Sequence, residues 1–324
     1  MRTNESIEPG ARRREFLRML CGGAAAAIAT KPAASPAAEA AGLPRGKIGD
    51  LELSRLMLGT NHITFYMHSR DLRYVDQLSR HYNTDEKIIE TFAAAEANGI
   101  NTFMTHGDPK IESLFKRYRS QRGGKMKWIV APWFDGPAKA MDVAAYTRLV
   151  PQLVDAGVDA LYVPGMITDR FVKEGKGELI GELLSTIKAC SVPGGVACHA
   201  LDVVRFCEEA KLPVDFYVKT FHHLKYPTAP PPETIKTDHA EVPGFWCRDA
   251  EAVSAFMAGV AKPWIAFKVM AAGAIPPKEA FQYAFSNGAD FILAGMFDFQ
   301  VAEDARIAAE VLAGLKSRPR PWCG

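Results

Sequence analysis

Short apolar segments alternate with helix-like periodicity eight times along residues 41–324, and this alternation predicts a single-domain α/β fold, the (β/α)8 TIM barrel. Eight such units in about 270 residues match the size of that fold. Glycine closes several helix-to-strand joints, as at Gly99, Gly157 and Gly288, because it accepts the left-handed conformation that ends a helix. The rival fold, an open doubly wound sheet, needs a glycine-rich phosphate turn after its first strand, which residues 59–62 (GTNH) do not supply.

The periodicity also sets the expected boundaries of the elements. Residues 85–98 illustrate the helical pattern, since Ile88, Ile89, Phe92 and Ala95 share one face. Strands are expected over residues 53–59, 100–105, 127–133, 158–164, 194–199, 214–221, 264–270 and 289–295. Helices are expected over residues 85–98, 111–118, 143–156, 179–189, 201–210, 250–260, 278–287 and 301–315.

Two connections, residues 61–84 and 224–248, are much longer than the others. Both follow the C-terminal ends of predicted strands, where barrel enzymes build their sites. We therefore expect them to act as lids or pocket walls, the alternative being plain surface loops.

The first 40 residues have the pattern of an export signal rather than of a folded domain. Residues 13–18 (RREFLR) precede a Gly/Ala-rich apolar stretch, residues 19–29, and resemble the twin-arginine (Tat) signal. Residues 38–40 (AEA) supply a small-x-small cleavage site. We expect cleavage after Ala40, and export of the folded protein by the Tat machinery to the periplasm or the extracellular space. The alternative is a basic tail without a targeting role.

The composition and net charge limit the kinds of binding partner that are expected. The 324 residues are 48% hydrophobic and 23% charged, with a formal net charge of +2, which favours neither a nucleic-acid partner nor a polybasic membrane surface. The apolar stretch near the N-terminus is too short to span a bilayer, so no stable membrane anchor is expected. The cysteines form no CxxC pair, and the sequence therefore supports neither a zinc ribbon nor a redox motif.

Histidines and lysines gather where the predicted strands end. His106, His199 and Lys268 are the candidate catalytic residues. Imidazoles exchange protons near neutral pH, and a lysine at the mouth of a barrel can stabilise an enolate or bind a carbonyl oxygen. A Schiff-base role for Lys268 would require a lowered pKa. The alternative for Lys268 is a structural lysine whose ammonium meets a carboxylate at the end of the strand.

Further residues at the same strand ends are candidates for binding. A divalent metal is a candidate cofactor because two imidazoles and carboxylates suit Zn, Mn or Fe, although no HxH or HExxH spacing is present. The candidate metal ligands are His222 and Asp298. The candidate substrate-binding residues are His62, Trp133, Asp135, Lys219 and Trp246.

Three segments resemble the aldo-keto reductases. Residues 47–60 are similar to the opening of that family, residues 266–273 to its late strand that ends in a lysine, and residues 284–304 to its closing strand and helix. The resemblance implies a TIM barrel with a small hairpin before the first barrel strand. It also implies a nicotinamide cofactor and a catalytic set of Asp, Tyr, Lys and His.

The sequence departs from the family at those catalytic positions. Met104 stands in the place of the aspartate, and no tyrosine follows it before Glu112. The place of the lysine falls on Pro132 or Trp133, and that of the histidine on Pro164 or Gly165.

The leading hypothesis is an exported enzyme of aldo-keto reductase ancestry with a rebuilt site. It would act on a carbonyl or sugar-like small molecule by acid/base chemistry, with or without a metal, as an isomerase, lyase or hydratase. One alternative is an oxidoreductase with a tightly held NAD(P) and non-standard catalytic residues. The other is a non-catalytic carbohydrate-binding barrel.

Overall fold

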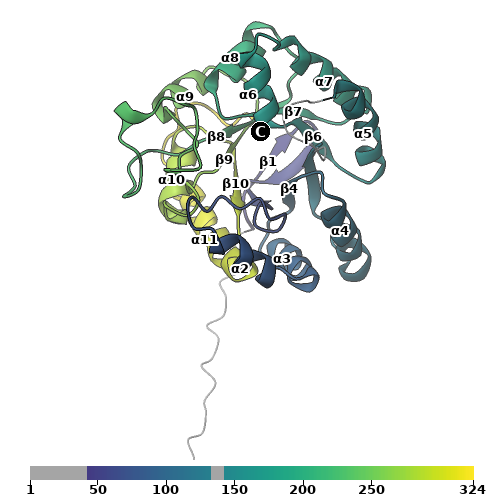
Figure 1. Ribbon diagram of the computed structural model, residues 1–324. Helices are drawn as coiled ribbons and strands as arrows, with labels where there is room; N and C mark the ends of the chain where they lie inside the picture. Colours follow the sequence, from purple (N-terminus) through teal and green to yellow (C-terminus); the bar gives the residue numbers. More distant parts are fainter. Residues whose placement is uncertain (1–41, 133–141) are drawn as a thin grey trace, which may run out of the picture. The chain divides into compact units, whose positions relative to one another are not determined.

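The computed structural model describes residues 42–132 and 142–324, which form a closed barrel of eight parallel strands ringed by helices (Figure 1). Around the barrel the order is β10-β3-β4-β5-β6-β7-β8-β9, so chain neighbours pair and the last strand closes on the first. The predicted (β/α)8 fold is confirmed. The barrel strands are β3 (Leu56–Gly59), β4 (Thr102–His106), β5 (Lys127–Ala131), β6 (Ala160–Val163), β7 (Gly194–Cys198), β8 (Phe216–Thr220), β9 (Trp264–Phe267) and β10 (Phe291–Gly295).

The helices follow the predicted alternation, with two additions. The described helices are α2 (Tyr74–Tyr82), α3 (Asp85–Ala97), α4 (Pro109–Arg122), α5 (Val143–Asp155), α6 (Gly165–Lys173), α7 (Glu178–Ala189), α8 (Leu201–Glu209), α9 (Ala250–Met257), α10 (Pro277–Ser286) and α11 (Asp298–Ala313), with a 3-10 turn η1 (Pro232–Thr234). Two of them were not predicted, α2 inside the long connection 61–84 and α6 directly after β6. Both have nine residues, as the predicted helix α8 does, and α2 buries only Ser79, so it has no apolar face that the sequence could show. None of the described helices is both long and apolar enough to cross a bilayer.

An antiparallel hairpin precedes the barrel, as the family resemblance implied. Its strands β1 (Arg45–Ile48) and β2 (Leu51–Ser54) pair through Ile48 and Leu51. Ile48 and Leu53 are fully buried in one apolar cluster with interior side chains of the barrel, such as Phe216. The predicted first strand, residues 53–59, was therefore wrong at its start, because residues 53–54 belong to the hairpin and β3 begins at Leu56.

The strands are buried on both faces, as expected of a parallel barrel. Their outward side chains pack under the helices in a second, larger apolar cluster. Aromatic rings fill part of it, with Phe103 4.4 Å from Phe115 and 5.9 Å from Trp128 between ring centroids. A rigid frame of this kind fixes the positions of the side chains at the strand ends.

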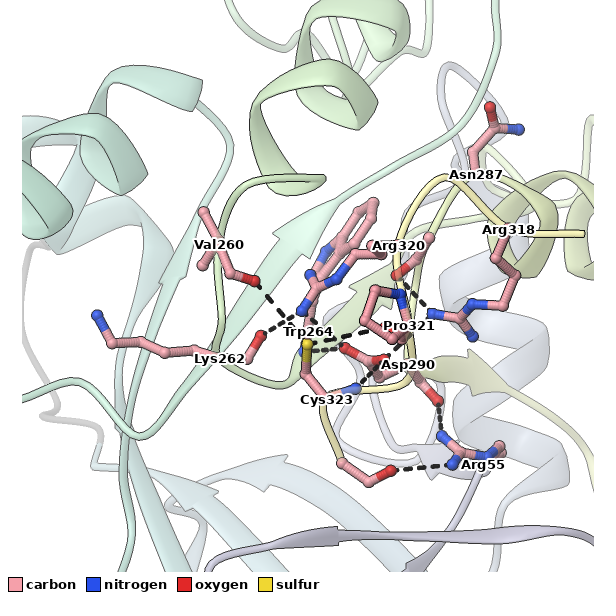
Figure 2. A network of polar contacts seen from close by, with 12 residues as sticks. Arg55, Val260, Lys262, Trp264, Asn287, Asp290, Arg318, Arg320, Pro321 and Cys323 are labelled. Atoms are coloured by element: carbon pink, nitrogen blue, oxygen red, sulfur yellow. Dashed lines mark hydrogen bonds and ion pairs between the residues drawn. The ribbon is translucent and has the colours of Figure 1, made fainter.

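At the N-terminal end of the strands, buried charges tie the last residues of the chain to the barrel (Figure 2). We call Asp290, Arg55, Arg318 and Arg320 the floor cluster. The Asp290 carboxylate accepts hydrogen bonds from Arg318 at 3.2 Å and from the backbone N–H of Trp264 at 3.0 Å, and pairs with Arg320 at 3.6 Å. Arg55 donates to the backbone carbonyl of Asp290 at 2.8 Å.

Two sets of sequence predictions lie outside the described residues. They are the export signal with its cleavage site in residues 1–40, and the candidate substrate-binding residues Trp133 and Asp135. They remain predictions.

Candidate active site at the barrel mouth

Four titratable side chains come together at the C-terminal end of the barrel. His199 follows β7, Lys268 follows β9, Asp169 lies on α6, and His239 lies in the long connection 224–248. We call these four residues the mouth cluster. Two of them, His199 and Lys268, are predicted catalytic residues.

Asp169 holds His199 in one orientation. Its carboxylate accepts the backbone N–H of His199 at 3.0 Å and that of Ala200 at 3.0 Å, and lies 2.7 Å from His199 Nδ1. A carboxylate partner places the ring proton on Nδ1, which assigns the lone pair to Nε2. Burial raises the pKa of the Asp169 carboxyl, and the two backbone N–H groups and the charge of Lys219 oppose that rise. Burial also lowers the pKa of His199 well below its ordinary value, followed by the charge of Lys268, so this imidazole is neutral at pH 7.

His239 stacks on His199. The two ring centroids are 4.0 Å apart, with an interplanar angle of 26°. His239 is the most exposed of the three residues Asp169, His199 and His239, and partial desolvation of its ring lowers its pKa. One ligand atom from each of Asp169, His199 and His239 lies within 4.8 Å of the others.

Lys268 is unusual in backbone and in surroundings. Its φ is +57°, a left-handed conformation that costs a residue with a side chain about 1–2 kcal/mol and is concentrated at functional sites. The Nζ lies 5.3 Å from the ring centroid of Trp246 and 5.8 Å from that of Phe267. Among the described residues it makes no hydrogen bond or ion pair, so the carboxylate partner expected of a structural lysine is absent there. Burial lowers the pKa of Lys268 to about 7, opposed by the carboxylates of Glu241 and Asp169.

Lys219, predicted to bind substrate, is turned toward the protein. Its Nζ donates to the carbonyl of His199 at 2.6 Å, to the carbonyl of Thr220 at 3.0 Å and to the hydroxyl of Thr220 at 3.1 Å. With the residue 1% exposed, these three bonds use all its donors. Lys219 therefore positions the backbone of His199.

The two long connections meet over Lys268. Glu241 of the second accepts a hydrogen bond from the backbone N–H of Arg70 in the first at 3.1 Å, and lies 2.9 Å from His68 Nδ1. The Arg70 guanidinium donates to the Thr228 hydroxyl at 2.8 Å. The connections 61–84 and 224–248 are thus hydrogen-bonded to each other, and we call them together the roof. Two surface hollows lie away from the mouth cluster, one beside the C-terminal tail and one along α4.

The proposed metal ligands His222 and Asp298 are not brought together. The Nε2 of His222 accepts the backbone N–H groups of Trp246 at 2.9 Å and Cys247 at 3.2 Å, and its Nδ1 lies 2.9 Å from the carbonyl of His223. Burial lowers the pKa of His222 to about 4. Both ring nitrogens serve the backbone, and His222 thereby anchors the end of the long connection that carries Trp246.

His106 and His62 lie on another part of the rim. His106 ends β4, three strands from β7 in the barrel, and its ring contacts that of Tyr66 at 4.5 Å. Burial lowers the pKa of His106. His62 follows β3 and packs against Phe297 at 4.8 Å, and burial lowers its pKa to about 4. Neither imidazole is among the three residues whose ligand atoms come together at the mouth, and their strands β3 and β4 lie four and three positions from β7 around the barrel.

Comparison with known proteins identifies the fold. No protein-family profile and no curated protein matches the chain. A protein from Pseudomonas aeruginosa described as an aldo-keto reductase superposes with a TM-score of 0.55 at 18% identity, over 83% of this chain and 96% of that one. An aldo-keto reductase from Bacillus halodurans in its holo form gives 0.54 at 10% identity, over 85% and 97%. The barrel shares its fold with these aldo-keto reductases. At these identities the likeness shows a shared fold.

The resemblance of the sequence to the aldo-keto reductases implies a nicotinamide cofactor, whose extra phosphate would meet a basic residue after the closing strand. Here β10 is followed by Phe297 and Asp298. The Asp298 carboxylate accepts hydrogen bonds from the Tyr82 hydroxyl at 2.6 Å and the Lys87 ammonium at 3.0 Å. An acid in this place repels a phosphate, and the nearby lysine is already paired with it. These residues do not fit that phosphate.

Two members of the mouth cluster, Asp169 and His239, were not predicted from the sequence. Asp169 lies on α6, a nine-residue helix that was not predicted either. His239 lies in the interior of a long connection, and no spacing relates it to His199. A helix prediction over residues 165–173 would have brought Asp169 to the mouth, whereas only the folded connection reveals His239.

Proposed function

We propose that this protein is an enzyme that transfers protons on a hydroxycarbonyl compound, as an isomerase or lyase, at the mouth of its aldo-keto reductase-like barrel. The observation that carries the proposal is the amine of Lys268, held beside His199 with no polar partner among the described residues. A half-buried lysine amine that makes no hydrogen bond or ion pair with the described residues is available to a substrate.

Lys268 supplies the proton-transfer group. Because burial brings its pKa to about 7, neutral amine and ammonium coexist near neutral pH. The neutral amine takes a proton from the carbon next to a carbonyl, and the resulting ammonium returns a proton to the same or the neighbouring carbon. The ammonium also stabilises the enolate that exists between these steps. A group with a pKa near the working pH serves both directions.

His199 orients the substrate opposite Lys268. With its ring proton held by Asp169, the Nε2 lone pair accepts a hydrogen bond from a hydroxyl next to the carbonyl. This complementarity favours hydroxycarbonyl compounds such as sugars over simple ketones. The names of the aldo-keto reductase neighbours likewise point to carbonyl compounds.

Deuterium exchange into simple hydroxycarbonyl compounds tests the proposal. Dihydroxyacetone, glyceraldehyde and a set of aldoses and ketoses are incubated with the protein in D2O and followed by proton NMR. We expect exchange at the carbon next to the carbonyl, lost in Lys268→Met and kept in Lys278→Met, which removes an exposed lysine on α10. Exchange of none of these compounds, or unchanged exchange in Lys268→Met, contradicts the proposal.

We also propose that the protein is exported by the Tat route, on the evidence of residues 13–18 alone. The test is to replace Arg13 and Arg14 together by lysine and to measure where the protein accumulates. Retention in the cytoplasm and loss of cleavage near Ala40 are expected. Unchanged export of the double variant contradicts the proposal.

A further inference from the structure

We propose that Asp169, His199 and His239 bind one divalent transition-metal cation, such as Zn²⁺, at the mouth of the barrel. Their ligand atoms all lie within 4.8 Å of one another. Over residues 42–132 and 142–324, no other group of three metal-ligating side chains comes so close together. The binding site stands without the proposed proton transfer, and only the catalytic role of the cation rests on that function.

Two of the three ligands are fixed in advance. Asp169 is held by the backbone N–H groups of His199 and Ala200, both at 3.0 Å. The carbonyl of His199 accepts the Lys219 ammonium at 2.6 Å, which fixes the residue from its other side. Ligands that are already oriented lose little freedom when a cation arrives, so less of the binding energy is spent on ordering them.

The set of donor atoms selects the kind of cation. Two imidazoles and one carboxylate suit Zn²⁺, Mn²⁺, Fe²⁺ or Co²⁺, whereas Ca²⁺ and Mg²⁺ prefer oxygen ligands throughout. An imidazole binds metal in its neutral form, and burial lowers the pKa of both His199 and His239. The lone pair of His199 that faces Asp169 is the one on Nδ1, so a bound cation would replace the proton between Nδ1 and the Asp169 carboxylate, and the ring proton would move to Nε2.

Nearby charges partly oppose and partly favour a cation. The ammonium groups of Lys219 and Lys268 repel it, while Asp169 as a ligand and Glu241 near Lys268 attract it. Lys268 can reduce the repulsion by giving up its proton, because burial already weakens its hold on it. Lys219 remains hydrogen-bonded to three oxygen atoms, which spreads its charge over the backbone.

The third ligand comes from the long connection 224–248, which also carries Glu241 and Trp246. His239 is exposed and stacks on His199, so it can turn toward a cation without disturbing the core. A bound cation would fasten this connection to the barrel. Under the proposed function, the cation would polarise the carbonyl oxygen of the substrate while Lys268 moves the proton. His199 Nε2 would then carry the ring proton and donate to the substrate hydroxyl instead of accepting from it.

The test is to dialyse the protein against a chelator and titrate it with Co²⁺ alone, following its visible absorption, with Zn²⁺ competition measured by calorimetry. We expect one equivalent of Co²⁺, displaced by Zn²⁺. His239→Ala should weaken Co²⁺ binding more than about 100-fold, beyond the 10–100-fold typical of outer-shell changes. His81→Ala, which removes an exposed imidazole on α2, should leave binding unchanged. Thermal melts of both variants verify folding.

Three results overturn the site: no Co²⁺ binding by the wild-type chain, equal affinity in folded His239→Ala, or equal loss in His81→Ala. Lys268→Met separates this inference from the proposed function, because Lys268 is not a ligand. If Lys268→Met binds Co²⁺ and still exchanges deuterium, the metal site stands and the proton-transfer role of Lys268 fails. If Lys268→Met loses deuterium exchange while the wild-type chain binds no Co²⁺, the proton-transfer role of Lys268 stands and the metal site fails.

Discussion

At the floor of the barrel, the carboxylate of Asp290 is fully buried and contacts two arginines and two backbone N–H groups. At the mouth, the amine of Lys268 has aromatic neighbours and makes no hydrogen bond or ion pair with the described residues. Both groups lie at the ends of barrel strands, but Asp290 is fully buried whereas Lys268 is partly exposed. The buried charges of the floor cluster stabilise the fold by pairing with one another, whereas the amine of Lys268 at the mouth remains able to contact a bound molecule.

Lys268→Met gives the largest expected effect on activity. Removing a proton-transfer group costs about 10²–10⁴-fold in rate, while methionine keeps the contact with Trp246 and leaves the fold intact. Deuterium exchange measures the rate, and a thermal melt measures the stability. If the melt collapses along with the rate, Lys268 is a structural residue and the contrast with the floor disappears.

Asp290→Asn gives the largest expected effect on stability. It removes the charge that pairs with Arg318 and Arg320, and breaking a buried pair costs about 3–5 kcal/mol. The matched control is Asp202→Asn, whose exposed pair with Arg205 is worth about 1 kcal/mol or less. Urea unfolding of both variants measures the difference. If both variants lost the same free energy of unfolding, burial would not determine how much these ion pairs contribute to stability.

The barrel could be predicted because its signals are local and repeated. Each strand is a short apolar run, and each long helix repeats its apolar positions, so residues 85–98 and 289–295 were placed to within two residues. The boundary between hairpin and barrel was missed because Leu53 and Leu56 are equally buried. That boundary depends on which strand each residue pairs with, which composition does not record.

The site was only partly predictable. The position of Lys268 at the end of an apolar strand pointed to the mouth, and the same reasoning found His199. His222 carries the same signal but serves the backbone through both ring nitrogens. Strand position gives the end of the barrel on which a side chain lies, while the direction of its nitrogen atoms depends on how residues 224–248 fold over it.

The pH dependence of stability gives an intermediate effect and sharpens the comparison. The pKa of Lys268 is about 7 in the folded chain, against an ordinary value of 10.5. Between these values the unfolded chain binds more protons, so the free energy of unfolding should rise with pH in that window. Relative to Lys268→Met, the rise should be on the order of 3 kcal/mol, below the full pKa difference because Lys268 keeps some solvent contact. Urea unfolding at pH 7 and pH 10 measures it, and parallel pH profiles would contradict the lowered pKa.

The smallest expected effect concerns the roof. Glu241 is about two-fifths exposed in its side chain, so its ion pair with His68 should contribute about 1 kcal/mol or less to stability. Glu241→Gln keeps the shape of the side chain and removes the charge that lies near Lys268. Its free energy of unfolding should therefore differ from that of the wild-type protein by about 1 kcal/mol or less. A double-mutant cycle with His68→Ala measures the pair directly. A coupling energy of about 3–5 kcal/mol, the size of the loss expected for Asp290→Asn, would mean that the roof stabilises the fold as strongly as the floor cluster does. Opening the roof to a substrate would then cost far more free energy than breaking a solvent-exposed ion pair.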